Sequence, residues 1–353
     1  MYLHFSKFLT DWYELNKRDL PWRHTNDPYL IWISEIILQQ TRVVQGLSYY
    51  HRFIELFPTV VHLAEAQEDD VLKCWQGLGY YSRARNIHKA SRQIINEFGG
   101  VFPKLHKDIL TLAGIGDYTS AAISSFAFNL PFAVVDGNVY RVLSRVFGIE
   151  TAIDTPKGKK EFAVLAQELL SQFQPGLHNQ AIMEFGALQC VPVSPNCSIC
   201  PFQQSCCALQ LNTISDLPFK SKKTMVSHRF FNYLFFKYQG QTFLQKRVDK
   251  DVWQNLYEFP LIESDHLLDA SELLENEQFV ELFDGIDELS ISNISMPIKH
   301  ILTHRIIFAQ FISIELPALN AAFGKFEIVP FVEIDKYAVS RLMEIFIEKL
   351  EFN

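Results

Sequence analysis

The 353-residue sequence has no uninterrupted apolar run of the ~18 residues that a membrane-spanning helix requires. Residues 1–10 also lack the positive start and apolar stretch of a secretory signal, so we expect a cytoplasmic protein without membrane contact. Internal repeats and low-complexity tracts are missing too. Apolar residues make up 48% of the chain and charged residues 20%, which is typical of an ordered globular protein. The length suits two domains.

Positive charge is scarce, because the net charge is −8. Its distribution is uneven: residues 1–228 hold 21 Lys and Arg against 20 Asp and Glu, whereas residues 229–353 hold 11 against 20. Residues 263–288 contain no Lys or Arg, and we interpret them as a solvated acidic surface that does not follow a phosphate backbone. The net charge therefore neither supports nor excludes nucleic-acid binding.

The pattern of apolar residues changes near residue 212. Before it, apolar positions recur at the three- and four-residue spacing of amphipathic helices, in 30–40, 70–75, 83–98 and 160–173. After it, aromatic and β-branched runs predict strands, at 230–238, 242–246 and 305–314, and a closing helix is predicted at 337–350. We therefore expect an all-α domain over 1–212, a polar, basic linker over 213–228, and an α+β domain over 229–353.

Five of the six cysteines lie between residues 190 and 207. In a chain of this length, such clustering favours a metal site over a disulfide framework. The first four have six, two and five residues between them, and they suit either a 4Fe–4S cluster or a structural zinc ion. Only one of Cys206 and Cys207 can point into such a site. Cys74 stands alone, and we expect it to be a small buried side chain.

Residues 112–123 combine a G-x-G turn, Gly114 and Gly116, with the start of a helix. Glycine lets the backbone approach a partner closely, and the free N–H groups at a helix start attract an anion such as phosphate. Many helix connections use glycine, so this turn is a weak signal by itself.

Two carboxylates have suggestive surroundings. Asp136 follows the apolar run 133–135 and precedes a helix, a position at which Asp most often serves as an N-cap. Glu35 is flanked by apolar residues in 31–38, and desolvation there would favour the protonated form that a general acid needs. A surface position on an amphipathic helix is the alternative for Glu35, and the sequence leaves it open.

Taken together, these segments resemble the adenine DNA glycosylase family, a branch of the endonuclease III superfamily of base excision repair enzymes. The matching segments cover most of residues 19–207 in the family's order: 19–23, 32–42, 77–86, the G-x-G hairpin, 135–145 and the cysteines. The resemblance implies a helix-hairpin-helix domain that acts as a monomer on double-stranded DNA with adenine opposite 8-oxoguanine. It also implies a 4Fe–4S cluster, with Cys190, Cys197, Cys200 and Cys206 as ligands.

The resemblance further implies a monofunctional hydrolase. Lyases of the superfamily carry a lysine two residues after the second hairpin glycine, and Tyr118 occupies that position, so no obligatory Schiff base is expected. Glu35 would protonate adenine at N7, and Asp136 would stabilise the sugar cation, as paired carboxylates do in glycoside hydrolysis. Tyr118 and Asn138 would support them by hydrogen bonds. The target base must first leave the helix stack.

Other residues are assigned DNA contacts by the same resemblance. Gln40 and Leu78 would wedge into the duplex, and Tyr80 would contact the 8-oxoguanine side. The remaining members of this DNA-binding set are Trp22, Arg23, Leu38 and Glu184 in the adenine pocket, together with Thr41, Gly114 and Gly116. Leu38 and Leu78 have plain core positions as their alternative, and Trp22 that of an ordinary buried aromatic. We expect the few basic residues to make most phosphate contacts: Arg83, Arg85, Arg141, Arg145 and the lysines of 220–223.

The second domain resembles the Nudix-like domain of the same family, through 244–247 and 256–260. No R-E-x-x-E-E string follows Pro260, so we expect a binder rather than a hydrolase. The Phe-Ser-His motif that checks the base opposite adenine corresponds here to Leu302-Thr303-His304. Thr303 keeps a hydroxyl, whereas Leu302 lacks the aromatic ring, and a loop without lesion contact is the alternative.

Three other functions compete with this interpretation. A glycosylase of the same fold could act on oxidised pyrimidines or on thymine opposite guanine. Tyr118 argues against the lyase version of this alternative, and residues 39–41 and the C-terminal domain argue against the version that acts on thymine. A non-catalytic iron–sulfur protein is disfavoured because Glu35 and Asp136 are both present. A nucleotide-pool hydrolase is disfavoured by the missing metal-binding glutamates.

Overall fold

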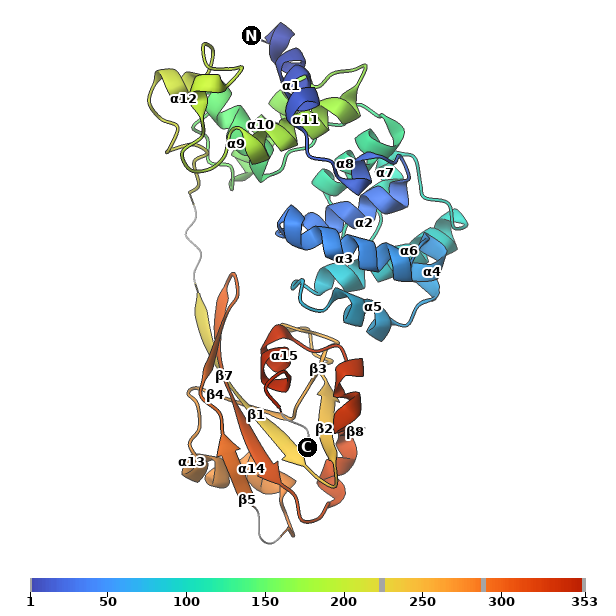
Figure 1. Ribbon diagram of the computed structural model, residues 1–353, viewed down its shortest axis with the longest axis vertical. Helices are drawn as coiled ribbons and strands as arrows, with labels where there is room; N and C mark the ends of the chain where they lie inside the picture. The colour runs from blue at the N-terminus through green and yellow to red at the C-terminus, as the bar shows by residue number, and fades with distance from the viewer. Residues whose placement is uncertain (1, 222–225, 287–289, 351–353) are drawn as a thin grey trace. The chain divides into compact units, whose positions relative to one another are not determined.

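The computed structural model describes residues 2–221, 226–286 and 290–350 (Figure 1). Part of the expected linker, 222–225, lies outside the described residues. The chain forms two compact units: Met1–Glu65 with Asn86–Lys223, and Ala66–Arg85 with Thr224–Asn353. Among the helices of the described residues, none combines the length and the apolar character needed to span a bilayer.

The first unit is helical (Figure 1). Its elements are α1 (Tyr2–Asn16), η1 (Pro21–Arg23), α2 (Pro28–Leu38), α3 (Val43–Leu56), α4 (Val60–Glu65), most of α6 (Ser82–Phe98), α7 (His106–Ile109), α8 (Asp117–Phe128), α9 (Gly137–Phe147), α10 (Pro156–Leu169), α11 (Pro175–Leu188), η2 (Cys197–Ile199) and α12 (Cys207–Gln210). Local sequence explains several boundaries. Asp27 and Thr155 cap α2 and α10, and a proline follows each at the first helical position. Gly148 ends α9 in the left-handed conformation.

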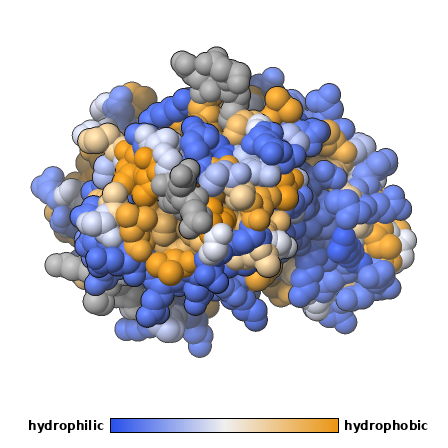
Figure 2. Space-filling view, turned by 90° about the horizontal axis from the view of Figure 1, so that it is seen from below, coloured by the Kyte–Doolittle hydropathy of each residue, from blue (hydrophilic) through white to orange (hydrophobic). Residues whose placement is uncertain are grey.

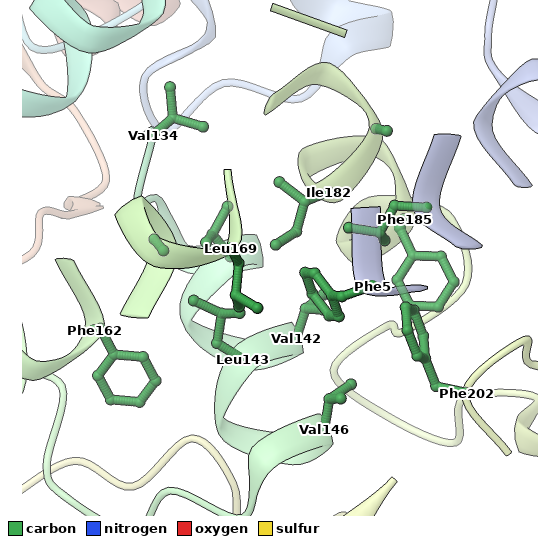
Figure 3. Packing of buried hydrophobic residues seen from close by; sticks show 14 of the residues in the cluster. Phe5, Val134, Val142, Leu143, Val146, Phe162, Leu169, Ile182, Phe185 and Phe202 are labelled. Atoms are coloured by element: carbon green, nitrogen blue, oxygen red, sulfur yellow. The ribbon is translucent and has the colours of Figure 1, made fainter. Parts of the chain in front are cut away.

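The core of the first unit lies between α1, α9, α10 and α11 and extends to the cysteine-bearing segment (Figure 3). Phe202 lies between Cys200 and Cys206 and is fully buried. Its ring packs against Phe5 of α1 and Phe185 of α11, with centroids 5.2 and 5.4 Å apart. This aromatic contact anchors the segment that carries the cysteines to the helical core.

The second unit is built on a five-stranded sheet with the path β4-β1-β7-β5, and β6 also pairs with β7. Its central strands β1 (Ser227–Lys237) and β7 (Arg305–Glu315) run parallel, with Ser227 opposite Arg305 and Lys237 opposite Glu315. A smaller sheet has the order β3-β2-β8. The other elements are α5 (Glu68–Trp75), β2 (Gln241–Lys246), β3 (Tyr257–Glu258), β4 (Leu261–Ser264), α13 (Ala270–Glu275), α14 (Glu277–Leu282), β5 (Ser290–Ile294), β6 (Ile298–Ile301), η3 (Ala321–Lys325), β8 (Glu327–Pro330), η4 (Phe331–Lys336) and α15 (Arg341–Ile347).

Residues 66–85 belong to the second unit through polar contacts with residues far along the chain. Asp69 accepts from Lys246 Nζ at 2.5 Å and from the Tyr257 hydroxyl at 3.1 Å. Gln76 donates to Glu344 and accepts from the N–H of Val339. The loop at 77–80, which follows α5, is therefore held by the same unit as the strands.

The expected fold class, a helical domain followed by an α+β domain, is confirmed. The acidic segment 263–288 is solvated as expected over its described part, where each Asp and Glu is exposed; Asp287 and Glu288 lie outside the described residues. On the face seen in Figure 2, hydrophilic side chains predominate at the margin and hydrophobic ones gather toward the middle.

Candidate active site

A pocket of about 850 Å³ in the first unit collects most of the site residues predicted from the sequence. Its walls come from α2 and the loop after it, from the starts of α8 and α9, and from α11. The predicted residues that line it are Glu35, Tyr118, Asp136, Asn138, Trp22, Arg23, Leu38, Gln40, Thr41 and Glu184. These positions span more than 160 residues of sequence, so the fold brings them together.

Glu35 projects from α2 into this pocket and is only 6% exposed, so the alternative of a surface position is wrong. The Tyr118 hydroxyl donates to Glu35 Oε2 at 2.6 Å. Burial raises the pKa of Glu35 from 4.5 to about 7, although the bond from Tyr118 and the charge of Arg23 act in the opposite direction. Glu35 therefore holds its proton readily near neutral pH, as a general acid must.

Asp136 both caps α9 and lines the pocket, so its two interpretations hold together. Its Oδ1 accepts from the N–H of Val139 at 2.8 Å, and its Oδ2 accepts from Asn138 Nδ2 at 2.8 Å. Burial raises its pKa, and these donors, together with Arg141, oppose the increase. The cap fixes the direction in which the carboxylate faces the pocket.

Asn138 is held from behind by Arg141. Arg141 Nη2 donates to Asn138 Oδ1 at 2.8 Å and to the carbonyl of Gly186 at 2.6 Å. A Cβ at Gly186 would lie 2.6 Å from Asn138 Cβ, so only glycine allows α11 to approach the start of α9 this closely. These contacts fix Asn138, and through it one oxygen of Asp136.

Glu184 lines the pocket as predicted, but it is fully engaged by two arginines. Arg18 and Arg23 bind its two carboxylate oxygens at distances of 2.6 to 3.0 Å. Burial opposes ionisation of Glu184, but these bonds outweigh it and hold the pKa at about 2. Sequence reasoning missed Arg18, although it directly precedes the matching segment 19–23. It also missed Gln180 and Met183, which line the pocket from α11, four residues and one residue before Glu184.

The loop after α2 presents Gln40 to solvent. Gln40 is exposed and has a φ of +57°, a left-handed conformation that costs energy for a residue other than glycine. Gln39, its neighbour, donates to the Thr119 hydroxyl at 3.3 Å, which ties the loop to α8. Thr41 and Leu38 are half-buried beside it. The exposed position agrees with the predicted duplex contact of Gln40, which stays a prediction.

The G-x-G turn precedes α8 as expected. Gly114 has a φ of +75°, and a Cβ there would lie 2.6 Å from Asn86 Cβ, so both backbone and packing require glycine. Gly116 caps α8, and no atom lies within 4 Å of the place where its Cβ would be. The backbone is therefore open to a partner at Gly116.

The second unit holds the residues predicted to contact the base opposite adenine. Tyr80 is 48% exposed, and its hydroxyl lies 2.6 Å from Thr303 Oγ1. Thr303 and His304 are exposed at the tip of the hairpin between β6 and β7. Leu78, in contrast, is only 8% exposed. The structure does not present it for insertion into a duplex, and its position is that of a core residue.

The expectation that Arg83, Arg141 and Arg145 contact phosphates is wrong for this structure, because all three are buried. Arg145 donates to the carbonyls of Leu217, Val191 and Pro192. A guanidinium enclosed by carbonyl oxygens stabilises the fold and is withheld from a phosphate. Arg85 is half-buried and donates to a carbonyl of the second unit, and Lys222 and Lys223 lie outside the described residues.

The four predicted ligand cysteines line one small pocket beside Phe202: Cys190, Cys197, Cys200 and Cys206. Two donors point at their sulfurs: Arg145 Nη1 lies 3.6 Å from Cys190 Sγ, and the N–H of Phe202 lies 3.4 Å from Cys200 Sγ. Within the described ranges, no three His, Cys, Asp or Glu side chains are placed to hold a metal ion. Cys74 is buried, as expected.

Comparison with known proteins identifies both parts of the chain. The family model described as "HhH-GPD superfamily base excision DNA repair protein" matches residues 33–170, and that of the NUDIX domain matches residues 232–349. The adenine DNA glycosylase of Buchnera aphidicola subsp. Schizaphis graminum is 37% identical over 257 residues, which are 72% of this chain and 74% of the relative. The human adenine DNA glycosylase is 40% identical over 58% of this chain and 39% of its own length.

Solved structures agree with this identification. A thermostable thymine-DNA glycosylase is 30% identical, with a TM-score of 0.56 over 60% of this chain and 97% of its own. Endonuclease III from a non-covalent DNA complex has a TM-score of 0.51 over 60% of this chain and 98% of its own; at 20% identity it supports the fold alone. The helical fold, the Nudix-like domain and the relatives together show that the chain belongs to the adenine DNA glycosylase family.

Proposed function

We propose that this protein hydrolyses the N-glycosidic bond of adenine paired with 8-oxoguanine or guanine in duplex DNA. The observation that carries the proposal is the pairing of Glu35 and Asp136, two carboxylates with different hydrogen-bond partners, in one pocket. The names of the relatives, adenine DNA glycosylases, support adenine as the base. The pocket is large enough for a single base, which must leave the duplex to enter it.

Glu35 supplies the proton. Its Oε2 accepts from Tyr118, which leaves Oε1 to carry the proton that is transferred to N7 of the flipped adenine. The carboxylate formed by the transfer keeps the hydrogen bond from Tyr118, which is stronger to a charged acceptor than to a neutral one. The leaving group therefore departs as neutral adenine rather than as an anion, and the acid that drives its departure is stabilised as it ionises.

Asp136 faces the sugar that becomes cationic as the bond breaks. The donors Val139 N–H and Asn138 Nδ2 hold both its oxygens in place without a neutralising ion pair. A fixed carboxylate stabilises positive charge as it develops, electrostatically or through a transient covalent bond. Water then adds to the sugar carbon and loses a proton, which yields free adenine and an abasic site.

We propose hydrolysis without an obligatory Schiff base. The described residues that line the pocket include no lysine, and Tyr118 stands where lyases of the superfamily carry one. The pocket therefore offers no amine nucleophile to the sugar.

We further propose that Cys190, Cys197, Cys200 and Cys206 hold a 4Fe–4S cluster. Their shared pocket and the two donors aimed at their sulfurs fit four thiolates around a cluster. When bound, the cluster would cross-link the segment 190–206. Arg145 ties the same segment to α9 through Val191 and Pro192.

Single-turnover excision tests the function on duplexes with adenine opposite 8-oxoguanine, adenine opposite guanine, and thymine opposite guanine. The Asp136→Asn variant keeps an N-cap, because Asn caps a helix as well as Asp does, but it loses the negative charge. The matched control is Asp269→Asn, which makes the same change at the N-cap of α13.

We expect the native protein to release adenine fastest opposite 8-oxoguanine. In Asp136→Asn this rate should fall at least about a hundredfold, because a preorganised charge is removed. Asp269→Asn should keep the native rate. Thymine release in place of adenine would refute the proposed substrate, and an active Asp136→Asn variant would refute the role of Asp136.

A further inference from the structure

The loop at 248–255, which we call the bridging loop, contacts two segments that carry the residues proposed to read the base opposite adenine. On one side, Arg85 Nη1 donates to the carbonyl of Gln254 at 2.7 Å, and Asn255 Nδ2 donates to Glu68 Oε1 at 2.5 Å. These contacts hold the segment 66–85, which bears Tyr80. The other side of the loop faces the β6–β7 hairpin, which bears Thr303.

Asp251 is the centre of the contacts on the hairpin side. Its Oδ1 accepts from Arg305 at 2.5 Å, and its Oδ2 accepts from Arg229 at 2.6 Å and from Arg247 at 3.1 Å. Arg229 and Arg247 have carboxylates of their own, Glu263 and Glu258. Among the described residues, Asp251 is therefore the acceptor that binds the Arg305 guanidinium.

Arg305 directly follows the hairpin tip. The turn is closed by the Leu302 N–H, which donates to the Arg305 carbonyl at 2.8 Å, and the His304 carbonyl accepts from the Ser227 N–H at 3.0 Å. Thr303 and His304 are exposed between these two bonds. The bridging loop adds a second contact, because the Trp253 ring packs against His300 of β6 at 5.5 Å. Holding Arg305 thus restrains the exposed tip.

We propose that Asp251 is a positioning residue for recognition of the base opposite adenine. The inference rests on the proposed function, in which Thr303 and Tyr80 contact that base. 8-Oxoguanine and guanine have nearly the same shape, so a hydroxyl distinguishes them only if it is held within about 0.5 Å of its productive position. Asp251 fixes the hairpin through Arg305, and the bridging loop fixes the segment of Tyr80 through Arg85. Thr303 and Tyr80 therefore keep their positions relative to each other.

The test compares Asp251→Asn and Asp251→Glu with the control Asp249→Asn, in the full-length holoenzyme. Asp249 is exposed, and its substitution removes the same charge two residues away. The readout is the ratio of the single-turnover rates with adenine opposite 8-oxoguanine and opposite guanine. We expect Asp251→Asn to lower this ratio about tenfold, as loss of an enclosed charged partner does, and to change the rate opposite guanine less than about twofold.

Asp251→Glu should recover part of the ratio, because it restores the charge for Arg305, and Asp249→Asn should keep the native ratio. An equal loss of both rates in Asp251→Asn would overturn the proposal, because it would show only a general loss of structure. An unchanged ratio would also overturn it.

Hydrogen exchange separates this inference from the proposed function. The amides of Leu302 and Ser227 close the hairpin tip, and we expect both to exchange at least about tenfold faster in Asp251→Asn than in the native protein or in Asp249→Asn. If the native protein shows no preference for 8-oxoguanine, the proposed specificity fails, and the exchange rates still decide whether Asp251 positions the tip. Unchanged exchange would overturn the positioning role.

Discussion

Replacement of Glu35 by Gln is expected to abolish adenine release and, at alkaline pH, to stabilise the protein. The carboxyl is buried, and among the described residues it accepts its side-chain hydrogen bond from the Tyr118 hydroxyl. Burial holds its pKa at about 7, against 4.5 for the free side chain. The folded protein therefore binds this proton more tightly than the unfolded chain does, and the stability that results is lost as the pH rises.

The structure sets the size of the effect. Each tenfold difference in acid dissociation constant corresponds to about 1.4 kcal/mol, so a change from 4.5 to about 7 corresponds to about 3 kcal/mol. This contribution is fully present below pH 4.5, falls as the pH rises from 4.5, and is lost above about 7. Gln carries no charge and incurs no such loss. The unfolding free energy of Glu35→Gln, minus that of the native protein, should rise by about 3 kcal/mol between acidic and alkaline pH.

The assay is urea-induced unfolding, followed by tryptophan fluorescence at a series of pH values, together with single-turnover excision. Glu97→Gln is the matched control, because it makes the same substitution at an exposed position of α6. If the stability of Glu35→Gln relative to the native protein does not change with pH, the conclusion that burial raises the pKa of Glu35 is refuted. A variant that still releases adenine would refute its role as the acid.

Three further outcomes follow from the same geometry. Tyr118→Phe removes a hydrogen bond that lowers the pKa of Glu35, so excision should persist to higher pH than in the native protein or in Tyr140→Phe; a shift to lower pH would contradict this. Glu184→Gln leaves Arg18 and Arg23 without their carboxylate and should lower the unfolding free energy by about 3 kcal/mol. The control Glu14→Gln breaks an exposed ion pair with Lys17 and should lower it by at most about 1 kcal/mol. Equal losses would argue against a buried network. Phe202→Ala should cost about 3–5 kcal/mol and reduce the iron content of the purified protein, whereas Phe173→Ala, at an exposed site, should do neither.

Much of the fold could be predicted because its elements have strong local patterns. The predicted strand 305–314 is found as Arg305–Glu315, and the predicted helix 83–98 as Ser82–Phe98. Boundaries shifted where capping outweighs periodicity. The helix expected at 160–173 begins at Pro156, because Thr155 caps it and proline favours the first helical position. The closing helix expected at 337–350 is shorter, Arg341–Ile347, because Ser340 caps it and Val339 pairs with Tyr257.

Long-range polar contacts could not be predicted from the sequence. Asp69 binds Lys246 across 177 positions, and no local periodicity indicates that residues 66–85 join the second unit. The arginines show the same limit. The positive charge of Arg145 would suit a phosphate contact. Its guanidinium is instead enclosed by carbonyl groups from two distant loops. Residue type identified the charge, and only the fold determines which partner the charge meets.

Two carboxylates of the active-site pocket show why burial alone does not set their chemistry. Glu35 and Glu184 are both buried, yet the pKa of one is about 7 and that of the other about 2. The difference comes from their neighbours, because Glu184 receives two guanidiniums and Glu35 a single hydroxyl. The two environments also depend on each other. Arg23 lowers the pKa of Glu35, and its bonds to Glu184 pair this positive charge with a negative one. Glu184 thus offsets the positive charge that acts against the protonated form of Glu35.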